Sequence, residues 1–214
     1  MPHVRDFSQV NKHDVHLAGG KGASLGEMTR AGLSIPPGFV VAADVFDQFY
    51  GKVLSKEITE EILVAFDRLD SEFVAVRSSA TAEDSQAASW AGELESYLNT
   101  SREQLLEHVQ KCWQSLFSDR AVAYRKEKGL EGAKISVAVV VQKMIQADVA
   151  GITFTVHPVT KDADQMIIEA CWGLGELIVG GMVTPDSYVI RKSDRTIIEV
   201  RQNDQDEMLV RGLD

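Results

Sequence analysis

The sequence has little cysteine, and its histidines are scattered. Cys112 and Cys171 are the two cysteines among 214 residues, and neither has a CxxC spacing or a paired histidine nearby. This pattern argues against a disulfide framework and against a zinc site. We expect both to be reduced, buried thiols, since free cysteine is among the most buried residue types. The five histidines, His157 among them, form no cluster, and we expect structural roles for them.

Long apolar runs and an excess of positive charge are also missing. No apolar run approaches the ~20 residues of a membrane span, and the N-terminal segment MPHVRDFSQV has no apolar core of a signal peptide. The formal net charge of −10 argues against non-specific nucleic-acid binding and against an anionic membrane surface as partner. We therefore expect a cytoplasmic protein with no nucleic-acid or membrane partner. Such a protein can still bind ATP, because that requires only local positive charge.

The hydrophobic pattern changes repeatedly between helical and extended periods, which predicts an α+β protein. We expect two lobes, the first covering about residues 1–130 and the second about 131–214. A helix is expected within 19–32, with Gly32 as its stop. Further helices are expected from 43 or 44, from a cap at Thr59, and from a capping box at Ser101 and Gln104 to about 126. Strands are expected at 38–42, 74–76, 135–142, 151–158 and 166–170, followed by paired edge strands at 187–192 and 196–202.

The segment VAVRSSATAED, residues 74–84, is the most informative stretch. A short apolar strand ends at Arg77, small and hydroxyl-bearing residues follow, and Glu83 and Asp84 come next. Hydroxyls, backbone N–H groups and the guanidinium fork all donate hydrogen bonds, so the stretch suits an anion such as phosphate. The alternative is an ion pair between Arg77 and Glu83 or Asp84 at the end of a strand.

Two further segments suggest a nucleotide. In Gly19-Gly20-Lys21-Gly22, glycines before a helix permit close approach of a phosphate, which Lys21 would meet. The segment is not a Walker A loop, and a solvated turn before a surface helix is the alternative. In VVVQKM, Gln142 would lie at the edge of an adenine, with Met144 packed on its ring. The alternative is that both residues simply end a strand.

Taken together, the motifs resemble a known family. GGKGASLGEM, IPPGFVV, VRSSATAED, SWAGELESYLN, LFSDRAVAYR, VVVQKMI, AGITFTVHP and EACWGLGE occur in this order. They resemble the N-terminal ATP-binding domain of the phosphoenolpyruvate synthase and pyruvate phosphate dikinase family, a domain shared by rifampin phosphotransferases. The resemblance covers nearly the whole chain. It implies an ATP-grasp fold with the nucleotide between two lobes.

The resemblance also implies roles for individual residues. Lys21 and Arg77 would bind the ATP phosphates and act as the catalytic cations. Gly92 and Ser96 would cover the phosphates, with Ser96 in place of a commoner threonine, and Gln142 would lie in the adenine pocket. No residue of this chain is assigned to a metal. The Mg²⁺ ligands of the family belong to a later strand, expected beyond Asp214, so we expect a C-terminally truncated domain.

Enzymes of this family transfer phosphate from ATP to a histidine on a swivelling domain, and a third domain passes it to pyruvate. In the resistance enzymes, an antibiotic hydroxyl receives it instead. The partners implied are therefore ATP, a phosphohistidine domain and a pyruvate-binding domain, and we expect the isolated chain to be inactive. Two alternatives remain: a nucleotide-binding module without catalysis, and a folded remnant that no longer binds nucleotide. The segment between Phe49 and Phe73 is shorter than in many relatives.

Overall fold

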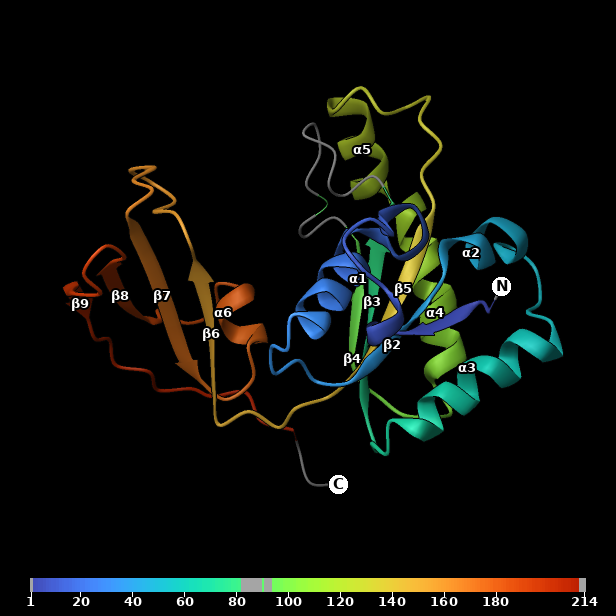
Figure 1. Cartoon of the computed structure of the whole chain (residues 1–214), viewed down its shortest axis with the longest axis horizontal. Helices are drawn as coiled ribbons and strands as arrows, with labels where there is room; N and C mark the ends of the chain where they lie inside the picture. Colours follow the sequence, from blue (N-terminus) through green and yellow to red (C-terminus); the bar gives the residue numbers. More distant parts are fainter. Residues whose placement is uncertain (1, 82–89, 91–93, 212–214) are drawn as a thin grey trace. The chain divides into compact units, whose positions relative to one another are not determined.

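A computed structural model describes residues 2–81, 90 and 94–211. The chain divides into two compact units, Met1–Met144 and Ile145–Asp214, and each has its own sheet (Figure 1). Within the described residues, no helix is long and apolar enough to cross a membrane.

The first unit is built on a five-stranded antiparallel sheet with the order β1-β2-β5-β3-β4. The strands are β1 (Val4–Asp6), β2 (Gly38–Val41), β3 (Val74–Ala80), β4 (Ser96–Thr100) and β5 (Val137–Lys143). The central strand β5 is buried from Val137 to Val141. A β-branched run of this kind fits a strand that is covered on both faces.

Helices cover both faces of this sheet, with α1 on one side and α4 on the other (Figure 1). On the α1 side, Ala18 packs with Val40 of β2 and Val140 of β5. On the other side, the larger core contains Val76, Val139 and the α4 residue Trp113. The helical elements of this unit are η1 (Phe7–Gln9), α1 (Val15–Arg30), α2 (Ala43–Phe49), α3 (Lys56–Arg68), α4 (Leu105–Gln114), η2 (Ser115–Phe117) and α5 (Asp119–Glu127).

The second unit contains a four-stranded antiparallel sheet with the order β6-β7-β8-β9. Its elements are β6 (Val149–Phe154), β7 (Gln165–Trp172), α6 (Glu176–Val179), β8 (Asp186–Arg191) and β9 (Ile197–Arg201). The short helix α6 contributes Leu177 and Ile178 to a small core with Cys171 of β7. Every residue of β9, the edge strand, is exposed.

Mixed helix and strand confirm the α+β class, and several local predictions are correct. The buried strand at 135–142 is β5, the paired strands at 187–202 are β8 and β9, and Gly32 has the positive φ of a helix stop. The compact units divide after Met144, whereas the expected lobes divide near residue 130. The reason is that β5 hydrogen-bonds to β2 and β3 and therefore joins the first sheet.

Other local predictions were wrong. The strand of the VRSSA motif continues to Ala80, and neither β1 nor β4 was expected. The helix predicted from Ser101 to about residue 126 is interrupted, because Ser118 is extended and its hydroxyl caps a new helix by accepting from the N–H of Ala121. Ser55, rather than Thr59, caps α3 by accepting from the N–H of Ile58.

Both cysteines are free and buried, as the sequence predicts. Burial raises the pKa of the Cys112 thiol to about 12, so almost no thiolate is present near neutral pH. We therefore expect a thiol reagent such as DTNB to leave the native chain unlabelled at pH 8 and to label two thiols per chain in denaturant. Rapid labelling of either cysteine before unfolding would contradict this arrangement.

His108 on α4 predicts a pH-dependent stability of the first unit. Its ring stacks on Tyr97 with centroids 4.5 Å apart, and its Nδ1 lies 2.8 Å from Thr100 Oγ1. Burial, followed by repulsion from Lys111, lowers the pKa of His108. The native state therefore favours the neutral ring, whereas the unfolded chain takes up a proton near pH 6.5.

We accordingly expect the free energy of unfolding to fall as pH drops from about 7.5 towards the lowered native pKa of His108. Urea titrations between pH 7.5 and 5.5 measure this slope. The variant His108→Gln should flatten it, whereas His13→Gln, on an exposed residue, should not. Equal slopes in the native chain and in His108→Gln would show that His108 is not responsible.

Candidate functional site

The glycine-rich turn, residues 19–22, lies inside α1 and interrupts it. Gly19 has φ 65° and ψ 174°, outside the helical region, and the helix resumes after it. A Cβ at Gly19 would lie 2.2 Å from the carbonyl oxygen of Ser79 on β3. Both the backbone angle and the contact require glycine. The turn that carries Lys21 is therefore pressed against β3.

Ser79 fastens this turn to the sheet. Its hydroxyl accepts a hydrogen bond from the N–H of Gly22 at 3.2 Å and donates one to the carbonyl oxygen of Ala18 at 2.8 Å. The side chain is fully buried. The Ser79 hydroxyl thus joins β3 to two positions of α1, Gly22 and Ala18, which lie 57 and 61 residues before Ser79 in the sequence.

Arg77, Ser96 and Gln142 share the sheet face on which α1 packs. Arg77 stands directly opposite Ser96 of β4 and Val140 of β5. Opposed residues of an antiparallel ladder share a face, as do residues two apart in a strand. Val140 packs with Ala18 of α1, which identifies the face. Gln142, two residues beyond Val140, belongs to it as well.

The structure thus gathers the predicted residues Lys21, Arg77, Ser96 and Gln142 on α1 and the sheet face beneath it. Lys21, Arg77 and Gln142 are half-buried, and Ser96 is exposed. Gln142 donates from Nε2 to the carbonyl oxygen of Pro36 at 3.1 Å. Met144 follows β5 and donates from its N–H to the carbonyl oxygen of Phe73 at 3.1 Å.

Gly92, Glu83 and Asp84 lie outside the described residues. The expected ion pair between Arg77 and one of these two acids therefore stays an open alternative. Among residues 2–81, 90 and 94–211, no group of three His, Cys, Asp or Glu side chains could hold a metal ion.

The serines of VRSSA differ from the expected anion-binding loop. Both belong to β3 and are buried, and their hydroxyls bind protein groups. Ser78 donates to the carbonyl oxygen of Glu95, just before β4, at 2.9 Å, and its hydroxyl also lies 3.2 Å from the carbonyl oxygen of Cys112 on α4. Sequence reasoning missed Ser79 as the support of the glycine-rich turn. The glycine pair at 19–20 was the available signal, because such glycines often mark close approach of another backbone.

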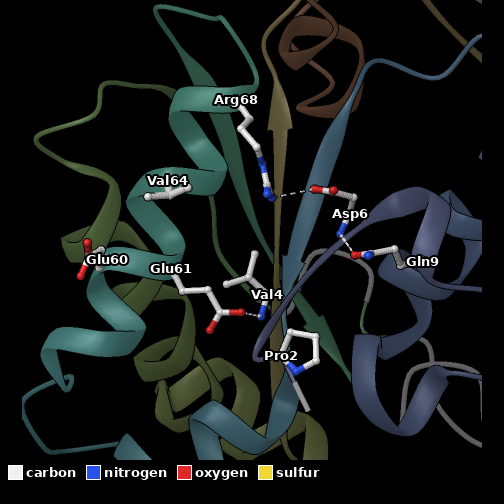
Figure 2. Close-up of a pocket in the computed structure, with 8 residues that line it drawn as sticks. All are labelled: Pro2, Val4, Asp6, Gln9, Glu60, Glu61, Val64 and Arg68. Carbon is white, nitrogen blue, oxygen red and sulfur yellow. Dashed lines mark hydrogen bonds and ion pairs between the residues drawn. The ribbon is translucent and has the colours of Figure 1, made fainter.

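A separate cavity of about 300 Å³ lies between the N-terminal strand and α3 (Figure 2). Three of its four charged side chains are already engaged: Arg68 binds Asp6 at 3.3 Å, and Glu61 accepts from the N–H of Val4 at 3.0 Å. None of the predicted site residues lines it. Its acidic lining repels phosphate, so we prefer the α1 face as the functional site. The full lining is Pro2, Val4, Asp6, Gln9, Glu60, Glu61, Val64 and Arg68.

Comparison with known proteins identifies the family. The family model of the pyruvate phosphate dikinase AMP/ATP-binding domain matches residues 15–53 and 49–213. The chain belongs to this family. The two matched segments overlap at residues 49–53, at the end of α2.

Several proteins similar to this chain are named phosphoenolpyruvate synthases. A probable one from Methanothermobacter thermautotrophicus is 38% identical over 98% of this chain and 37% of its own length. Another from Archaeoglobus fulgidus is 42% identical over 96% of this chain and 33% of its own length. The phosphoenolpyruvate synthase of Aeropyrum pernix is 39% identical over 95% of this chain and 30% of its own length. The chain spans about a third of the length of these relatives.

The close approach at Gly19 predicts a large effect of adding one methyl group. Gly19→Ala would place Cβ against Ser79 at a positive φ, and we expect a loss of about 3 kcal/mol or more in unfolding free energy. Gly32→Ala is the matched control, because Gly32 has φ 78° but a Cβ added there would meet nothing within 4 Å. Its expected cost is about 1 kcal/mol. Equal losses in urea titrations would refute the steric argument.

Proposed function

We propose that this chain is the ATP-binding part of a phosphoenolpyruvate synthase-like phosphotransferase with an ATP-grasp-type fold. Membership of an AMP/ATP-binding family supports ATP as the ligand, and the names of the relatives support the enzyme class. The observation that carries the proposal is the fastening of the Lys21 turn to β3, the strand of Arg77. Two cations held by adjoining segments suit a polyphosphate in a chain whose net charge is −10.

In this proposal, Lys21 and Arg77 bind phosphate oxygens. Lysine meets phosphate as a point charge, whereas the arginine fork donates two parallel hydrogen bonds and fixes orientation. Ser96, directly across the ladder from Arg77, offers a hydroxyl to the same phosphates, and the family resemblance assigns a covering role to Gly92. Holding the phosphates and neutralising their charge is the principal catalytic contribution to phosphoryl transfer.

Gln142 and Met144 are proposed to hold the adenine. Both lie at the end of β5, where the strand pairing continues through the bond from Met144 to Phe73. Since the Gln142 Nε2 group already binds Pro36, its amide orientation is set in advance of ligand binding. Preorganised groups of this kind reduce the ordering cost of binding.

The phosphate would pass from ATP to a histidine on a separate domain and then to pyruvate. The relatives' names favour pyruvate over an antibiotic hydroxyl, because phosphoenolpyruvate is the product that they state. Mg²⁺ supplies charge neutralisation to such reactions when it is bound. Among the described residues, no cluster of His, Cys, Asp or Glu side chains fits it. Both thiols are free, which supports a reducing cytoplasm as the location.

Calorimetric titration of the chain with ATP and MgCl₂ tests the proposal. We expect saturable binding that Lys21→Ala and Arg77→Ala each weaken about 10- to 100-fold, the range for a lost hydrogen bond to a charged group. The controls are Lys12→Ala and Arg102→Ala, which remove cations with exposed carboxylate partners elsewhere in the first unit. Absence of ATP binding, or equal effects of site and control variants, would reject the proposal.

A further inference from the structure

The break in α1 leaves a helix start without a capping side chain. The helical segment that resumes after Gly19 presents N–H groups with no acceptor within the helix, as every helix start does. A serine, threonine, aspartate or asparagine at the cap position normally accepts from the second or third N–H. Gly19 occupies that position here and has no side chain. An acceptor must therefore come from elsewhere in the protein.

Ser79 supplies this acceptor from a different element. Gly22, the third residue after Gly19, donates its N–H to Ser79 Oγ, which is the bond that a capping serine ordinarily receives. The same hydroxyl donates its hydrogen to Ala18, on the other side of the break. One buried hydroxyl thus fixes both sides of the interruption, with no exposed surface at which water could replace it.

Ser79 also lies two residues beyond Arg77 on the same strand and therefore on the same face. Its hydroxyl consequently connects the segment that carries Lys21 to the strand that carries Arg77. The backbones approach this closely because Gly19 has no Cβ.

We propose that Ser79 is a positioning residue that sets the place of Lys21 relative to Arg77, so that both cations reach the phosphates of one nucleotide. Ser79 does not itself touch the nucleotide in this proposal, because its hydroxyl is already engaged by Gly22 and Ala18. The inference rests on the proposed function, since it assigns Lys21 and Arg77 to a common ligand.

Ser78 provides a matched control one residue away. It is also buried, but its hydroxyl faces α4 and binds the carbonyl oxygen of Glu95. Ser78→Ala and Ser79→Ala each remove one buried hydroxyl from β3, and we expect both to lower the urea midpoint. Titration with ATP and MgCl₂ should separate them: Ser79→Ala weakens binding about tenfold, the effect of one lost hydrogen bond, whereas Ser78→Ala leaves it within about twofold.

A double-mutant cycle with Lys21 adds a readout that a purely structural role would not change. If Ser79 acts through Lys21, then Lys21→Ala should cost much less affinity in the Ser79→Ala background than in the native chain. Should Ser79→Ala fail to fold, Ser79→Cys, which retains a weak donor and acceptor, takes its place in every titration.

Unchanged ATP affinity in Ser79→Ala, equal weakening by Ser78→Ala, or additive effects of Ser79 and Lys21 would each overturn the inference. These results differ from failure of the proposed function. That failure appears as no ATP binding by the native chain, or as binding insensitive to Lys21→Ala and Arg77→Ala. Native binding that depends on Lys21 but not on Ser79 would reject only the positioning role.

Discussion

The contact between the glycine-rich turn and β3 is the constraint on which the first unit depends. At Gly19 the backbone of α1 meets the backbone of Ser79 so closely that no side chain fits between them. The approach continues along the helix, since a Cβ at Gly22 would lie 3.1 Å from Cγ2 of Val40 on β2. Small residues on one side of α1 let the helix lie low over the sheet. This brings the segment of Lys21 to the face of Arg77.

The strand order then decides which residues become neighbours. β5 lies between β2 and β3 although more than 50 residues separate it from either in sequence. Its pairing with β3 places Gln142 and Arg77 on one face, and β4 adds Ser96 to the same face. The candidate site is therefore a product of sheet topology. Local sequence supplies the residue types, and the antiparallel register brings them together.

The same distinction explains what the sequence could and could not predict. The β-branched run of β5, the β8–β9 pairing and the stop at Gly32 are local patterns, and they were predicted correctly. The end of β3 and the existence of β4 were not predicted, because both depend on residues distant in the sequence. β4 is a strand because it pairs with β3. Ser78 and Ser79 can lie in a buried strand because distant groups accept their hydrogen bonds. The family resemblance suggested the candidate residues, but only the strand register shows that Arg77, Ser96 and Gln142 share one face.

The two serines of the VRSSA motif, Ser78 and Ser79, have a structural role beside Arg77. A buried hydroxyl without a partner is costly, so each serine must be matched by groups on its own side of the sheet. Ser78 meets carbonyl oxygens next to α4, and Ser79 meets both sides of the break in α1. Successive residues of one strand thereby fasten helices to opposite faces. In the proposed function, phosphate binding by the motif depends on Arg77, and the two serines hold in place the elements that surround it.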